Sequence, residues 1–171
     1  RPGLSSRCTS PQQSRLAFVN CIGTGEIVGI DIRKPAVVGR FKLEGGPDAV
    51  PVQFSVTEAG FPVWAANQGM GSAGLALSAT KISDIPIGFK PVGLAAEESG
   101  KRAFLVGPDS DRLARAEADG GMKSFNLIAP GGGNKGVACT RDGNLVAAVH
   151  PLKQCASVLR GQELRLRHLE G

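Results

Sequence analysis

The residues best suited to metal chemistry are two cysteines and two histidines near the end of the chain: Cys139, His150, Cys155 and His168. Thiolate sulfur and imidazole nitrogen are the usual ligands of structural zinc. Zinc ligands usually come in pairs two to four residues apart, whereas these four are unpaired and widely spaced. They would sit on different strands, so convergence is geometrically allowed. We nevertheless expect strand cysteines and surface histidines here, with no metal and no cofactor.

Two glycine-rich stretches invite comparison with phosphate-binding loops. The segment 69–74, GMGSAG, matches G-x-G-x-x-G and follows an apolar run. A dinucleotide site requires a helix directly afterwards, and the following LALSA instead favours a strand. In the segment 131–136, GGGNKG, the next residue is Val137, where a Walker motif would place Lys and then Ser or Thr. Both stretches are therefore predicted to be turns.

Catalytic groups of other kinds are few. The G-x-S-x-G elbow of serine hydrolases is absent, and two histidines leave few candidates for a general base. Asp109 and Asp111 share a loop and could bind calcium, although a calcium loop usually offers more oxygen ligands nearby. We predict no catalytic residue.

A repeated phrase must position these side chains. It consists of an apolar run, a Gly-bearing turn, a second run, a polar loop and a third run. Clear copies are PVQFSVTEAGFPVWAANQG, PVGLAAEESGKRAFLVGPD and KGVACTRDGNLVAAVHP, and a less regular one opens with SRCTSPQQSRLAFVNC. The turn glycines Gly60, Gly100 and Gly143 lie 40 and 43 residues apart. A period of this size, built from short strands, is typical of propeller blades.

The predicted fold is all-β: a β-propeller of about four blades, each a four-stranded antiparallel sheet. It forms a single domain or propeller fragment over residues 1–171. The blades are placed near 3–46, 47–88, 89–131 and 132–171. The similar segments GRFKLEG and LRLRHLEG indicate that the chain starts and stops on blade boundaries. Four blades would then close as a small ring, or two chains would pair as a homodimer that completes a ring of about eight.

The segment Gly88–Val106, GFKPVGLAAEESGKRAFLV, resembles the YVTN-type β-propeller repeat. Six residues fit that pattern of Pro, apolar strand, acidic-Gly turn, basic residue and aromatic-rich strand: Pro91, Glu97, Gly100, Lys101, Arg102 and Phe104. Asn20 and Asn67 fit the Asn that closes the strand, whereas Gly107 and His150 depart from it, and the usual Tyr is missing throughout. Members of this family usually close with about seven blades, so the resemblance implies a short or partial ring.

In a propeller, loops that leave the second strand and loops that enter the next blade share one rim. The first group carries Asn20, Asn67, Asp109 and His150, which are the predicted ligand-binding residues. The second group carries 46–48, 90–91 and 134–135. A ring of such side chains could bind a polar ligand or a peptide. The alternative is that they cap their own turns, as Asn and Asp often do.

Composition narrows the choice of partners. The chain has a net charge of +5, but Lys and Arg are scattered, Tyr is absent and aromatic residues make up 5%. Nucleic-acid binders usually combine basic patches with stacking aromatics, so no nucleic acid is expected. No apolar run approaches the roughly 20 residues of a membrane span. Cys8, Cys21, Cys139 and Cys155 permit two disulfides or free thiols. The compartment is left open, with the periplasm or extracellular space favoured.

The function predicted first is a non-catalytic binding or scaffolding module that contacts a protein or peptide through its loop rim. The alternative is a propeller-type enzyme or enzyme subunit, either a lactonase-like hydrolase or part of a periplasmic dehydrogenase. That alternative predicts a metal or quinone cofactor. A third interpretation is a surface-layer or adhesive repeat. Propellers support many unrelated activities, so the fold alone does not choose among them.

Overall fold

A computed structural model describes residues 16–45, 48–56, 62–78, 81–127, 131, 133–160 and 165–168. Its strands form four antiparallel sheets, as the all-β prediction requires. The first sheet holds β1 (Leu16–Cys21), β2 (Glu26–Asp31) and β3 (Ala36–Lys42). The second holds β4 (Pro51–Val56), β5 (Val63–Asn67), β6 (Ser72–Ser78) and β7 (Lys81–Pro86).

The third sheet holds β8 (Gly93–Ala96), β9 (Arg102–Val106), β10 (Arg112–Glu117) and β11 (Met122–Asn126). The fourth holds β12 (Gly136–Cys139), β13 (Leu145–His150), β14 (Cys155–Arg160) and β15 (Arg165–His168), with the short 3-10 turn η2 (Pro151–Lys153) between β13 and β14. Within each sheet the strands pair in chain order, which is a meander. Each sheet lies inside one of the four predicted blade ranges. The first shows three strands among the described residues, where four were predicted.

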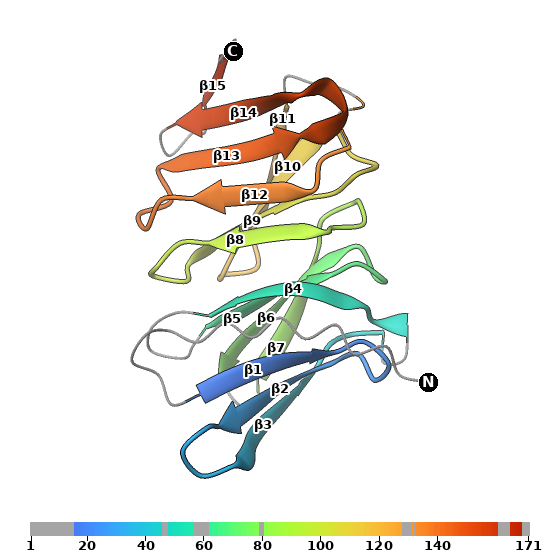
Figure 1. The fold of residues 1–171 in the computed structure, drawn as a ribbon, viewed down its shortest axis with the longest axis vertical. Coiled ribbons are helices and arrows are strands. Elements are labelled where there is room, and N and C mark those ends of the chain that lie inside the picture. The colour runs from blue at the N-terminus through green and yellow to red at the C-terminus, as the bar shows by residue number, and fades with distance from the viewer. Residues whose placement is uncertain are drawn as a thin grey trace.

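The sheets stack face to face in one row, with the first and the last at opposite ends (Figure 1). Along the described part of the chain they form an open arc and close no ring (Figure 1). Closure of four blades within one chain is therefore not seen. Each sheet packs on the next through a layer of apolar side chains, called here a seam.

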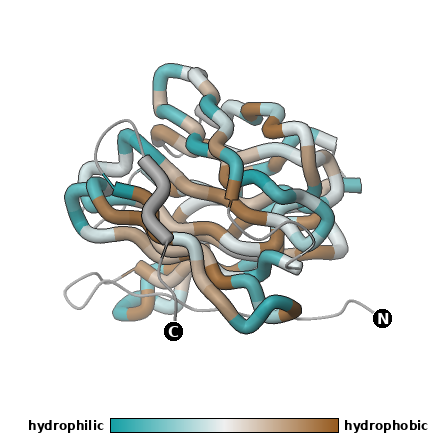
Figure 2. The backbone as a smooth tube through the Cα atoms, turned by 90° about the horizontal axis from the view of Figure 1, so that it is seen from above, coloured by the Kyte–Doolittle hydropathy of each residue, from teal (hydrophilic) through white to brown (hydrophobic). Residues whose placement is uncertain are grey.

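Side chains that point alternately to the two faces of the inner strands fill these seams. In β5, Val63 and Ala65 pack toward the first sheet, whereas Trp64 and Ala66 pack toward the third. Since successive side chains of a strand point to opposite faces, all five residues of β5 are buried. The outer strands β3 and β11 are mostly exposed: β11 carries Lys123, Ser124 and Asn126, whereas β3 exposes apolar residues such as Val37 and Val38. Hydrophilic residues accordingly gather at turns and hydrophobic ones along the strands (Figure 2).

The turn glycines that revealed the period have a conformational reason. Gly100 and Gly143 lie in equivalent turns between the first and second strands of their sheets, with φ of 68° and 64°. This left-handed region costs non-glycine residues energy. At Gly143 a Cβ would also lie 2.6 Å from Oε2 of Glu97 in the preceding sheet. The tightness of the seam between the third and fourth sheets thus depends on this glycine.

Candidate functional site

The predicted rim loops do meet, and His150 lies at one of the meeting points. Its Nδ1 bonds Oδ1 of Asn134, in the loop that enters the fourth sheet, and its Nε2 lies 2.6 Å from Oγ of Ser157 on β14. Asn134 Nδ2 donates to the carbonyl of Ser110, 2.5 Å away in the third sheet. This relay of four residues therefore joins the rim of the third sheet to the core of the fourth.

The relay fixes the protonation of His150. Because Asn134 donates through Nδ2, its Oδ1 must accept, so Nδ1 of the imidazole carries the proton. Nε2 then accepts the hydroxyl proton of Ser157. Serine, histidine and an orienting amide form the geometry of a nucleophile with its general base. However, Ser157 and Asn134 are 0% exposed and His150 is 1% exposed, so a substrate cannot reach the hydroxyl. The hydrogen bonds among Ser157, His150 and Asn134 therefore connect buried parts of the fold.

Burial lowers the pKa of His150 below its ordinary value of 6.5, and the charge of Asp111 partly opposes the shift. The unfolded chain thus binds the proton more readily than the folded one, and folding stability decreases as the pH falls below about 6.5 toward the lower folded pKa. We expect the free energy of unfolding to be smaller at pH 5.5 than at pH 7.5, and His150→Gln to reduce this difference. Urea denaturation at both pH values measures it. Equal acid losses in both proteins would contradict the assignment.

Asn67 is also fully buried and uses its amide inside the chain. Oδ1 accepts the backbone N–H of Val50 at 3.1 Å, and Nδ2 donates to the carbonyl of Glu44 at 3.2 Å. It therefore holds the loop that links the first and second sheets. Asp84 strengthens the same junction, because it accepts the N–H of Glu44 at 2.8 Å and the hydroxyl of Ser72 at 2.8 Å.

Asn20 does not occupy the position equivalent to Asn67. The hairpins pair Cys21 with Glu26 and Asn67 with Ser72, so Cys21 is the counterpart of Asn67. Asn20 is one residue earlier and points to the opposite face, into the seam with the second sheet. It is 3% exposed, and its Oδ1 has no hydrogen-bond partner among the described residues. The equivalence expected from the sequence is therefore corrected by one residue.

Asp109 is the one predicted site residue that faces solvent. It borders a hollow of about 700 Å³ at the rim between the second and third sheets, lined by 87–89, 109–112, Met122, Ser124, Asn126 and Leu127. Asp111 accepts the N–H of Gly131 at 2.6 Å, so its carboxylate is held by the loop, whereas Asp109 has no such bond to the described residues. Met122 is 42% exposed and adds apolar surface. The rim hollow thus combines an available carboxylate with an apolar wall.

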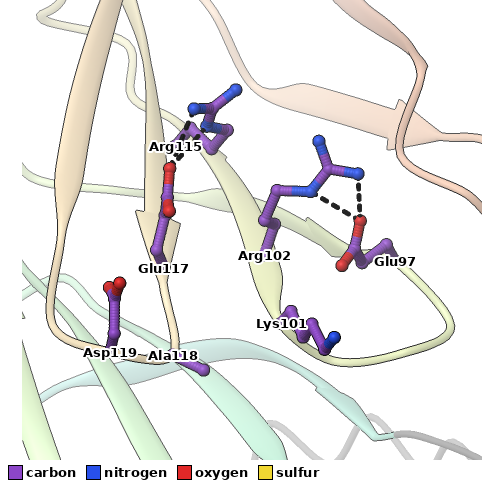
Figure 3. A pocket seen from close by; sticks show the side chains of 7 residues that line it. All are labelled: Glu97, Lys101, Arg102, Arg115, Glu117, Ala118 and Asp119. Carbon is purple, nitrogen blue, oxygen red and sulfur yellow. Dashed lines mark hydrogen bonds and ion pairs between the residues drawn. The ribbon is translucent and has the colours of Figure 1, made fainter. Parts of the chain in front are cut away.

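A second hollow, of about 630 Å³, lies at the opposite end of the third sheet (Figure 3). Arg115, only 5% exposed, pairs with Oε1 of Glu117 at 2.8 Å and lies 5.6 Å from the ring centre of Phe125. Arg102 binds Glu97 on the facing wall. Lys101 and Asp119 also line this hollow. The sequence analysis missed Arg115 and Ser157, because their surroundings depend on strand register.

The metal and loop predictions can be compared with the structure. No three metal-ligating side chains come together among the described residues. His150 pairs across strands with Cys155, but both ring nitrogens bond other groups. Cys21, Cys139 and Cys155 are free thiols, and burial, aided by Glu97, raises the pKa of Cys139 to about 11. Cys8, His168's side chain and Gly60 lie outside the described structure.

The segment 69–74 is a turn that enters β6, and 136 begins β12, so no helix follows either glycine-rich stretch. No helix within the described ranges is long and apolar enough to cross a membrane.

Solved structures share this fold. The chain is similar to a streptogramin B lyase, with a TM-score of 0.78 and 16% identity over 95% of this chain and 53% of that one. It is similar to virginiamycin B lyase from Staphylococcus aureus, with a TM-score of 0.80 and 13% identity over 97% and 55%. Hydrazine synthase of Kuenenia stuttgartiensis gives a TM-score of 0.74 and 19% identity over 98% and 50%. No protein-family model matches the chain, and no curated protein matches it.

At these identities the likeness establishes the fold alone. The predicted fold class is confirmed: the chain is all-β and has the architecture of a partial β-propeller. It spans about half the length of these three chains.

Proposed function

We propose that this partial propeller is a non-catalytic binding or scaffolding module that contacts a protein or peptide at its loop rim. The observation that carries the proposal is the rim hollow beside Asp109. The Asp109 carboxylate, which has no hydrogen-bond partner among the described residues, and the exposed Met122 side chain offer one polar and one apolar contact within the same concave surface. Peptide segments that combine a basic and an apolar side chain suit such a surface.

The loop that carries Asp109 is held from behind. Ser110 receives the Asn134 bond, Asp111 receives the Gly131 N–H, and Asn134 is in turn held by His150. A binding loop that is already ordered loses less conformational entropy when its partner arrives. His150, a buried residue among those predicted for the rim, thus supports the Asp109 loop indirectly through Asn134.

The YVTN-type assignment belongs to the same proposal. Glu97, Gly100 and Arg102, which fit that repeat, all lie at the turn that locks one sheet to the next. Repeated turns of this kind keep the blades in fixed register, as a scaffold requires.

The enzyme alternative is a lactonase-like hydrolase or a periplasmic dehydrogenase subunit, and among the described residues the Ser157–His150–Asn134 geometry is what would favour a hydrolase. A hydrolase would require the hydroxyl to meet its substrate, and all three side chains are enclosed in the seam. We therefore favour binding. Incubating the protein with an activated ester, with Ser157→Ala as the comparison, tests the alternative directly. Serine-dependent turnover would overturn our preference.

The rim is tested with a random peptide library selected on the immobilised chain. We expect enriched peptides to share a basic and an apolar residue. Asp109→Ala and Met122→Ala should each weaken such a peptide by about three- to tenfold, in line with roughly 0.5–1.5 kcal/mol per lost contact. Glu98→Ala removes a carboxylate of similar exposure, 46%, in the turn after β8 on the other edge of the same sheet, and is the control. Peptides that bind all three variants as well as the unmodified chain would rule out the rim hollow.

A further inference from the structure

The sequences of the third and fourth sheets align when one is shifted by 43 residues, the spacing between Gly100 and Gly143. Strand pairing obeys the same shift, because Leu105 faces Ala114 and their counterparts Ala148 and Ser157 also face each other. By this shift, the outer face of the fourth sheet is equivalent to the face of the third sheet that the fourth sheet covers.

That outer face is apolar. By alternation, Val146, Ala148 and Leu159 face the third sheet, where they belong to a buried cluster. Their neighbours in β13 and β14 face outward, and they are the following: Leu145, Ala147, Val149, Ala156 and Val158. Val149 is 45% exposed. If this face were solvated, polar residues would normally occupy the outward positions of β13 and β14. Apolar residues at these positions are typical of a face that another element covers.

A matching hollow supports this correspondence. The hollow beside Arg102 is lined by Glu97, Lys101 and Glu117 among others. The residues at the equivalent positions of the fourth sheet line a hollow of about 710 Å³. Thr140 corresponds to Glu97, Asn144 to Lys101, Leu145 to Arg102 and Arg160 to Glu117.

At the first hollow, the turn of the following sheet is held in place. Arg102 Nη2 donates to the Asp142 carbonyl at 2.7 Å, and the N–H of Glu98 donates to the Arg141 carbonyl at 2.8 Å. At the second hollow no following turn is present among the described residues. It therefore has the shape and place of a docking site for one more blade.

The first sheet provides the complementary surface. In the second sheet, Val63 and Ala65 face the preceding sheet, and their counterparts in β1 are Ala17 and Val19, by the shift that relates Cys21 to Asn67. Ile30 and Val37 pair on this same side, and Val37 is 52% exposed. Both ends of the arc therefore carry apolar faces of the kind that meet in its inner seams.

We propose that the outer face of the fourth sheet receives the first sheet of a second copy of this chain, so that two copies close one ring head to tail. One chain covers 50–57% of the length of the solved chains that it matches, so two copies supply about the length of one such chain. Closure removes both open ends at once through two identical seams. This inference is independent of the rim proposal, because it concerns the sheet faces and predicts mass, not peptide binding.

The experiment measures mass in solution by light scattering and native mass spectrometry. The 171-residue chain is expected at twice its mass of 17.7 kDa. Val149→Arg and Val37→Arg, at opposite ends of the arc, should each shift the protein to single-chain mass at micromolar concentration. Leu152→Arg, which changes an equally apolar residue that is 74% exposed in the η2 turn, is the control and should stay paired. Circular dichroism checks folding, and Val149→Ser replaces Val149→Arg if the latter unfolds.

Mixing the two variants gives the sharpest outcome. A pair of Val149→Arg and Val37→Arg chains retains one unmodified seam, so it should associate at least tenfold more tightly than either variant alone. A single-chain mass for the unmodified protein would overturn the proposal. Loss of pairing in Val149→Arg but not in Val37→Arg would also overturn it, because the fourth sheets would then pair with each other.

Discussion

Replacing Trp64 with alanine is expected to reduce the free energy of unfolding by about 3–5 kcal/mol, the usual cost of truncating a fully buried large aromatic side chain. Trp64 is 0% exposed and lies at the centre of the seam between the second and third sheets. Its indole Nε1 also donates to the carbonyl of Gly100 across that seam, at 2.8 Å. The substitution therefore leaves both a cavity and a buried carbonyl without its donor. Urea denaturation measures the loss.

Trp64→Phe separates the two contributions. Phenylalanine keeps most of the apolar volume but has no donor, so it should cost roughly 1 kcal/mol for the missing hydrogen bond plus a smaller packing loss. A cost for Trp64→Ala below about 1 kcal/mol would mean that this seam does not hold the two sheets together.

The architecture could be predicted because propeller geometry leaves local marks on the sequence. The third and fourth sheets each have a left-handed residue between their first two strands, and Gly100 and Gly143 mark it at a readable spacing. The run VWAAN is apolar at its first four positions because both faces of an inner strand are covered. These marks depend on residues close together in sequence. Closure of the ring depends on which faces meet, and the arc in the structure shows no closure within the described chain.

The site was harder to predict, because it depends on strand register. Asn20 and Asn67 both end a strand in the sequence, but a difference of one residue places them on opposite faces of their sheets. Ser157 meets His150 only through the pairing of β13 with β14. Asp109 was the exception, since a Pro-Asp-Ser-Asp loop is exposed in almost any register.

Arg115 departs from the repeat at a position that the alignment of the sheets identifies. The 40-residue shift between the second and third sheets makes it the counterpart of Leu75, a buried member of the preceding seam. An arginine at a leucine position indicates a local change in the seam, which the structure resolves as the ion pair with Glu117 and the hollow around it. Comparison of equivalent positions in successive sheets thus shows where one sheet differs from the others.

The seam between the third and fourth sheets is expected to weaken by about 3–5 kcal/mol in Arg102→Met, because the change leaves a buried carboxylate without its counter-ion. Arg102 Nε lies 2.7 Å from Oε2 of Glu97, and the two side chains are 17% and 5% exposed. The same guanidinium holds the carbonyl of Asp142 in the next sheet. Methionine preserves much of the length and none of the charge, so the loss should appear in urea denaturation as a lower midpoint.

Two further variants show whether the buried charge is the cause. Glu97→Gln in the Arg102→Met background should recover part of the stability, because the neutral amide needs no counter-ion and can still accept the bond from Ser99. Arg40→Met breaks an ion pair with Glu26 whose side chains are 60% and 20% exposed, and such a pair contributes about 0–1 kcal/mol. A loss in Arg102→Met no larger than that in Arg40→Met would show that water reaches Glu97. The Arg102–Glu97 pair would then add little to the stability of the seam.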